Sequence, residues 1–152
     1  MLNAIFFYRI SRWCYLHHIP LLPKLITLLI FLIYNSKVPP TAAIGKGTKL
    51  NYGGLGVVIH QSCVIGERCT IGQQVTLGGG NNRFPGVPRL GNDVYVAKGA
   101  AIIGGIDIGD NVTVGINAVV TKPVPANAIV AGVPARILRF KTEEGSHEAK
   151  HK

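Results

Sequence analysis

The chain has 152 residues, which allows one domain and a short appendage. Hydrophobic residues make up 47% and charged residues only 15%, and this balance excludes a disordered chain. The 19 glycines and 9 prolines favour a fold with many tight corners over one with long helices. The three cysteines (Cys14, Cys63 and Cys69) are too few for a disulfide scaffold and fit a reducing compartment.

The positive charge is concentrated in the N-terminal part of the chain. The formal net charge is +9, and no acidic residue precedes Glu67. The aromatic residues of this region stand among leucines and isoleucines rather than among glycines, serines or further basic residues. These aliphatic neighbours favour contact with lipid or a protein core, and we therefore expect no nucleic-acid partner.

Residues 1–36 form an apolar segment in which we expect two helices. The first covers about residues 3–17, and the second begins at Pro23, a favourable first residue, and stops at Asn35. Its apolar run of ten residues reaches about 15 Å, half the hydrocarbon thickness of roughly 30 Å, and does not span a bilayer unaided. A helical pair on a membrane and a pair buried in an oligomer both remain open. On a membrane, the basic side chains would face anionic headgroups: Arg9, Arg12, Lys24 and Lys37.

Residues 37–140 carry a repeat of six residues. Each repeat has an aliphatic residue, usually followed by glycine, and a small or aliphatic residue four positions after the first. The aliphatic positions are Ile59, Ile65, Ile71, Leu77, Leu90, Val96, Ile102, Ile108, Val114 and Val120. A period of six fits neither an α-helix nor a hairpin sheet, and describes one side of a triangular parallel β-solenoid. Aliphatic side chains would stack inside, and the glycines would take positive φ at the corners.

Two stretches lie outside the repeat. Residues 78–89 contain three consecutive glycines and two prolines, and must loop out of the solenoid, where interruptions usually serve binding. Residues 141–152 are polar and aperiodic, and we expect a disordered tail.

Residues 38–138 resemble the left-handed β-helix acyltransferases, specifically the serine acetyltransferase-like branch. The resemblance rests on the hexapeptides, on Val-Thr-Leu-Gly-Gly at residues 75–79, on Gly-Ile-Asn-Ala-Val-Val at 115–120 and on Ala-Gly-Val-Pro-Ala-Arg at 131–136. It implies an all-β left-handed parallel β-helix, a homotrimer, acetyl-CoA in a groove between adjacent prisms, and a histidine as general base.

The chain departs from that branch at three positions. Serine acetyltransferases carry an Asp-His pair where this chain reads Asn51-Tyr52, and a second histidine before proline where it reads Val87-Pro88. The upstream acidic partner corresponds to about Lys37. What remains resembles the sugar and polysaccharide O-acetyltransferases, in which a stretch like residues 52–60 is familiar. We therefore expect acetyl-CoA-dependent O-acetylation of a saccharide in surface-polysaccharide biosynthesis. The alternatives are a serine O-acetyltransferase and a non-catalytic membrane-associated scaffold.

His60 is the only histidine of the solenoid, and we assign it as the general base. The resemblance places acetyl-CoA contacts on backbone amides of Gly78, Gly79, Lys98 and Ile116, and on the side chains of Lys122 and Arg136, which would bind phosphates. We expect no metal, because Cys63 and Cys69 occupy inward positions of the repeat. The predicted location is the cytoplasm, at the inner face of the cell membrane, through residues 1–36.

Overall fold

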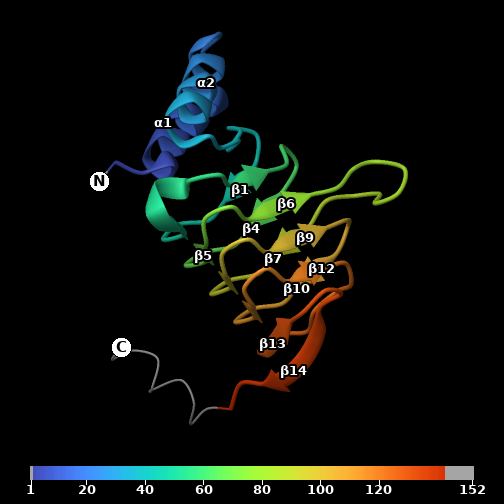
Figure 1. Ribbon diagram of the computed structural model, residues 1–152. Coiled ribbons are helices and arrows are strands. Elements are labelled where there is room, and N and C mark those ends of the chain that lie inside the picture. The colour runs from blue at the N-terminus through green and yellow to red at the C-terminus, as the bar shows by residue number, and fades with distance from the viewer. Residues whose placement is uncertain (1, 143–152) are drawn as a thin grey trace.

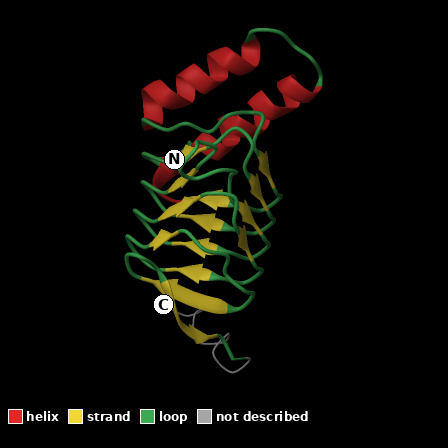
Figure 2. Ribbon diagram, turned by 90° about the vertical axis from the view of Figure 1, so that its right-hand side faces the viewer, coloured by secondary structure: helices red, strands yellow, loops and turns green. Residues whose placement is uncertain are grey.

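The computed structural model describes residues 2–142, and the predicted tail falls largely outside them. Residues 41–142 wind into a parallel β-solenoid, and two helices lie across its N-terminal end (Figures 1 and 2). The helices are α1 (Ala4–Leu16) and α2 (Leu22–Tyr34), close to the predicted bounds. No helix within residues 2–142 is long and apolar enough to cross a membrane.

The solenoid has three faces, each built from strands of successive coils. The first face contains β1 (Ala43–Ile44), β4 (Val64–Ile65), β7 (Arg89–Leu90) and β10 (Asp107–Ile108). The second contains β2 (Lys49–Leu50), β5 (Thr70–Ile71), β8 (Tyr95–Val96), β11 (Thr113–Val114), β13 (Ala128–Ala131) and β14 (Arg136–Phe140). The third contains β3 (Val58–Ile59), β6 (Thr76–Gly78), β9 (Ala101–Ile103) and β12 (Val119–Val120).

The register of the strands confirms the predicted coil length. Arg89 pairs with Asp107 and Tyr95 with Thr113, in each case one coil of 18 residues further along the chain. All pairs are parallel except β13 with β14, which closes the C-terminal end as an antiparallel ribbon. A short 3-10 helix, η1 (Asn51–Gly54), lengthens the first coil, and the loop at 78–89 lengthens the next.

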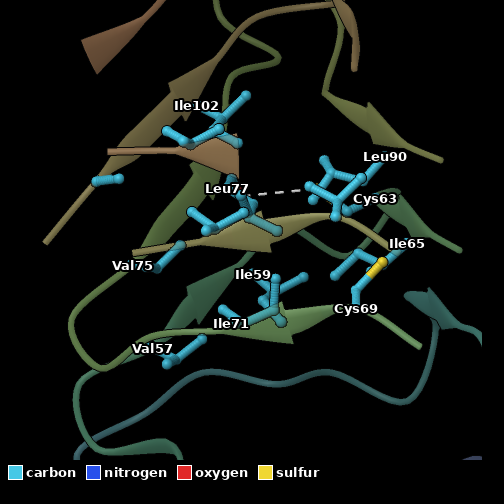
Figure 3. Close-up of a cluster of buried hydrophobic side chains, with 14 of the residues drawn as sticks. Val57, Ile59, Cys63, Ile65, Cys69, Ile71, Val75, Leu77, Leu90 and Ile102 are labelled. Atoms are coloured by element: carbon cyan, nitrogen blue, oxygen red, sulfur yellow. Dashed lines mark hydrogen bonds between the residues drawn. The ribbon is translucent and has the colours of Figure 1, made fainter. Parts of the chain in front are cut away.

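The core is the stack of aliphatic side chains that the six-residue period predicts. Every one of the ten aliphatic positions is buried, and so are the small residues that follow four positions later. Figure 3 shows Ile59, Ile65, Ile71 and Leu77 in this stack, with Cys63 and Cys69 among them. The inward side chains of each coil therefore pack against those of the next, and this stacking gives the solenoid a continuous core.

The glycines after the aliphatic residues serve a different purpose from the one predicted. Gly66, Gly72 and Gly115 have no positive φ, and the positive φ falls two residues later, at Arg68, Gln74 and Asn117. A Cβ at Gly72 would lie 2.6 Å from the backbone nitrogen of Lys98 in the next coil, and one at Gly115 would lie 2.9 Å from Ala131 Cβ. These glycines therefore permit close approach of neighbouring coils rather than a left-handed backbone.

Helix α1 caps the open N-terminal end of the solenoid. The buried Tyr8 hydroxyl donates to Ala42 O (2.6 Å) and accepts from Ile44 N (3.2 Å). Arg9 donates to Ile44 O and Gly45 O, and Arg12 to Pro40 O at 2.7 Å. Both guanidinium groups therefore satisfy carbonyls of the first coil. The expectation that Arg9 and Arg12 face lipid headgroups is wrong, because exposed carbonyls at the end of a β-solenoid need donors.

Candidate active site

His60 stands at the edge of the prism where the third face turns into the first. It directly follows β3, is half-buried, and its backbone N–H donates to Leu77 O at 2.9 Å. Because Ile59 pairs with Leu77, His60 stacks beside Gly78 of the next coil. A Cβ built on Gly80 would lie 3.4 Å from His60 Nε2. The edge thus brings the predicted base to the root of the protruding loop.

The His60 ring is held through its other nitrogen. The backbone N–H of Ser62 donates to Nδ1 at 3.1 Å. Nδ1 therefore carries a lone pair, and the neutral ring carries its proton on Nε2. In this arrangement Nε2 is a hydrogen-bond donor, and it becomes a base only when the Ser62 contact opens and Nδ1 takes the proton. Catalytic hydrogen bonds often reach their working geometry only in the substrate complex.

No carboxylate within residues 2–142 forms a hydrogen bond with His60. Glu67 and Asp93, the acidic residues nearest in the repeat, both pair with Arg68 at 2.9 Å on a different edge of the prism. The Arg68 guanidinium lowers the pKa of Asp93 through its hydrogen bonds. Ser62, which sequence analysis missed, is therefore the residue that orients the His60 ring in this structure.

The protruding loop at 78–89 is anchored at its root. Gly80 N donates to Phe84 O (2.8 Å) and Gly86 O (2.7 Å), and Gly105 N in the next coil donates to Pro85 O (2.9 Å). Gly79 has φ +144°, and a Cβ there would collide with the carbonyl of Gly86. The loop leaves the side of the solenoid beside β6 (Figure 1). The glycine run was the sequence signal for this crowded backbone.

The predicted amide donors lie on two different edges. Gly78 and Gly79 share the His60 edge, whereas Lys98 and Ile116 follow β8 and β11 on the edge before the third face. Asn117 N donates to Lys98 O at 3.0 Å, which confirms the predicted stacking of the last pair. The N–H groups of Gly79, Lys98 and Ile116 have no acceptor within residues 2–142, so they remain available to a ligand. One chain alone does not bring all four residues together.

Lys122 and Arg136 line one pocket near the C-terminal end of the solenoid. Its volume is about 360 Å³, and its other walls are mainly aliphatic. Thr121 continues the edge that begins at His60, because β12 pairs with β9 and β9 with β6. Three coil steps of about 4.8 Å place Lys122 about 14 Å along that edge from His60. The two predicted phosphate-binding side chains therefore meet, at a distance from the predicted base.

The buried cysteines are hydrophobic core residues. Burial raises the pKa of Cys63 to about 11 and also raises the pKa of Cys69. Both side chains are therefore neutral thiols near pH 7, and thiolate is the form that binds metal. Among residues 2–142, no three histidine, cysteine or acidic side chains are grouped so that they could hold a metal ion.

Comparison with known proteins places this geometry among serine acetyltransferases. No family model matches the chain. A serine acetyltransferase of Synechococcus elongatus is 37% identical over 137 residues, 90% of this chain and 56% of the relative. The solved structure of a serine acetyltransferase in complex with CoA is 34% identical with a TM-score of 0.80, covering 89% of this chain and 55% of that one. The Neisseria gonorrhoeae serine acetyltransferase superposes with a TM-score of 0.85 at 29% identity, covering 98% and 57%.

The fold is the hexapeptide-repeat left-handed β-helix of the serine acetyltransferase type. The predicted fold class is confirmed. This chain spans about half the length of the relatives that it matches. The comparisons do not support the predicted closeness to sugar O-acetyltransferases.

The predicted saccharide acceptor is wrong, because the matching relatives are named serine acetyltransferases. That prediction, and the role in polysaccharide biosynthesis, depended on the missing histidines and on the likeness of residues 52–60 to the sugar O-acetyltransferases. A general base determines how a hydroxyl loses its proton, not which hydroxyl is bound. The absence of those histidines therefore does not by itself identify the acceptor.

Proposed function

We propose that the chain transfers the acetyl group of acetyl-CoA to the hydroxyl of serine, with His60 as the general base. The observation that carries this proposal is the position of His60 Nε2 against Gly80, on a solenoid similar to that of serine acetyltransferases. His60 offers the only imidazole within the described solenoid.

The reaction forms one bond and breaks another. The serine Oγ attacks the thioester carbonyl, the C–S bond breaks, and the hydroxyl proton passes through His60 to the departing CoA sulfur. His60 accepts that proton on Nε2 after the Ser62 N–H releases Nδ1. The unpaired Gly79 N–H lies on the same edge and is suited to hydrogen-bond the oxyanion of the tetrahedral intermediate.

Acetyl-CoA would lie along an edge of the prism, in a groove completed by a second copy of the chain. The Lys122 and Arg136 pocket supplies cations for its phosphates, about 14 Å from His60 by the coil spacing. Lys98 and Ile116 present free amides on another edge, so they reach the same ligand only from a neighbouring copy. A homotrimer with three equivalent grooves meets this requirement by cyclic symmetry. Light scattering should then give three times the chain mass of 16.3 kDa for the active species.

The deciding experiment measures release of the CoA thiol from acetyl-CoA. We expect release that depends on L-serine and exceeds release with glucose or with no acceptor. His60→Ala should lower kcat by about 10²–10⁴, the usual range for a lost general base. His17→Ala, on the exposed end of α1, is the matched control and should leave kcat unchanged.

Two outcomes would contradict the proposal. Wild-type kcat in purified His60→Ala protein would remove His60 from the reaction. Acetyl-CoA binding without thiol release in the presence of serine would contradict the transferase activity and favour a non-catalytic scaffold.

A further inference from the structure

The helical pair at residues 2–34 exposes a large apolar surface at the N-terminal end of the solenoid. Fourteen of the 23 exposed large hydrophobic residues of the described chain lie between Leu2 and Ile33. They expose 40–70% of their area, so together they expose on the order of 1,000 Å² of mostly apolar surface. The largest apolar patch on a typical soluble monomer is about 300–600 Å². This surface therefore calls for a partner.

The apolar surface extends around most of helix α2. Only Pro23, Ile30 and Tyr34 of this helix are buried, and they lie within a narrow arc against α1 and the first coil. At 100° per residue, the exposed apolar side chains cover roughly 200° of the helix circumference: Leu22, Leu25, Leu28, Leu29, Phe31, Leu32 and Ile33. A single helix of a protein partner would cover a stripe about half as wide. Lipid can surround the whole arc.

Four exposed lysines lie at this end of the molecule. Lys24 is exposed at the start of α2, and Lys37, Lys46 and Lys49 are exposed on the segment that follows it and on the first coil. Arg9 and Arg12 do not belong to this set, because they bind backbone carbonyls. No acidic residue precedes Glu67, which lies in the second coil and is paired with Arg68.

This charge distribution favours lipid over a second copy of the chain. A symmetric dimer would place the same surface on both subunits, so the four exposed lysines of each would face those of the other. Juxtaposed like charges oppose association. An anionic lipid surface has the opposite charge and attracts each lysine.

We infer that residues 2–34 dock the protein onto an anionic lipid bilayer, with α2 in the interfacial plane and the four exposed lysines against the headgroups. The two helices lie across the end of the solenoid (Figure 2). The edge that carries His60 runs from the first coil away from this end, toward Thr121. The cytoplasmic leaflet, rich in anionic lipid, is the surface that this chemistry fits.

Trp13 provides a direct probe, because it is the single tryptophan and is 56% exposed on α1. The full chain is mixed with vesicles of phosphatidylcholine alone or with 30% phosphatidylglycerol, at roughly 50 and 500 mM salt. We expect co-sedimentation and a blue shift of the Trp13 emission with the anionic vesicles. Both should weaken at high salt and be much smaller with the neutral vesicles.

Point variants separate the apolar contribution from the charge. Leu25→Ser with Leu32→Ser should lower the vesicle partition coefficient by about 10–100-fold, because two exposed leucines no longer insert. Leu138→Ser, on an equally exposed leucine at the opposite end of the solenoid, is the matched control and should change nothing. Lys24→Gln with Lys49→Gln should weaken binding roughly fivefold per lysine, while Arg139→Gln on β14 should not.

Three results would overturn the inference. The first is no co-sedimentation with anionic vesicles by folded protein. The second is equal binding by the Leu25→Ser, Leu32→Ser protein and by the Leu138→Ser control. The third is self-association, measured by light scattering without lipid, that the two serine substitutions abolish; that result would assign the surface to a second copy.

Discussion

Tyr8→Phe tests whether α1 is a structural cap of the solenoid rather than a detachable anchor. Tyr8 is fully buried, and burial raises the pKa of its hydroxyl. Its hydroxyl is the only hydrogen-bond acceptor for the buried Ile44 N–H within residues 2–142, whereas Ala42 O also accepts from Arg12 at 3.1 Å. Phenylalanine preserves the ring packing and leaves Ile44 N–H unpaired. A buried unpaired donor costs about 1–3 kcal/mol, so we expect the free energy of unfolding to fall by about 2 kcal/mol.

The measurement is urea unfolding at one fixed protein concentration, because the stability of an oligomer depends on concentration. For a chain of this length, 2 kcal/mol corresponds to a Tm lower by about 4–8 °C. Tyr95→Phe is the matched control: its side chain is 44% exposed on β8, and its stability should stay within about 0.5 kcal/mol of wild type. Equal stabilities of Tyr8→Phe and wild type would refute the capping role of α1.

Two further predictions concern the solenoid. Gly72→Ala should destabilise the fold by about 1–3 kcal/mol in urea unfolding, because its Cβ would lie 2.6 Å from Lys98 N. Gly78→Ala is the control and should have a small effect, because the nearest contact of its Cβ is at 3.7 Å. A larger loss of stability in Gly78→Ala than in Gly72→Ala would contradict the close-approach role of these glycines. Cys63, with its pKa raised to about 11, should resist iodoacetamide at pH 7.5 until the chain is unfolded. Rapid labelling of the native protein would refute this protection. Because folding favours the neutral thiol, the contribution of Cys63 to the free energy of unfolding should be complete below pH 9 and should disappear as the pH rises through 11.

The core could be predicted from the sequence because the period of six places every aliphatic residue on the inside of the coil. Ile59, Ile71 and Val96 are each fully buried at their predicted positions. The role of the glycines could not be predicted in the same way. A glycine indicates either a positive φ or a close backbone approach, and only the neighbouring coil shows which one applies at Gly72.

The role of the N-terminal arginines could not be predicted either, because it also depends on which parts of the solenoid lie next to them. From the sequence, Arg9 and Arg12 are basic residues in an apolar segment, which favours headgroup contact. In the structure, the first coil has no preceding coil to donate to its carbonyls, and these two guanidinium groups replace that donor row. In the proposed membrane docking, contact with the lipid headgroups is made by the exposed lysines instead. Any variant that removes charge from this end therefore has to spare the arginines.

The sequence predicts where each candidate site residue stands in its own coil, but not which of these residues come together. The 18-residue spacing of Lys98 and Ile116 correctly predicts that they stack, because one coil has that length. Spacing gives no direct indication of which of the three edges a residue occupies once loops such as 78–89 interrupt the count. The structure places His60 with Gly78 and Gly79 on one edge and Lys98 with Ile116 on another. A ligand that contacts both sets therefore needs two chains. If the groove is shared in this way, an inactive variant on one edge and an inactive variant on the other should regain activity when they are mixed in one oligomer. If each chain holds its own complete groove, mixing them should restore no activity.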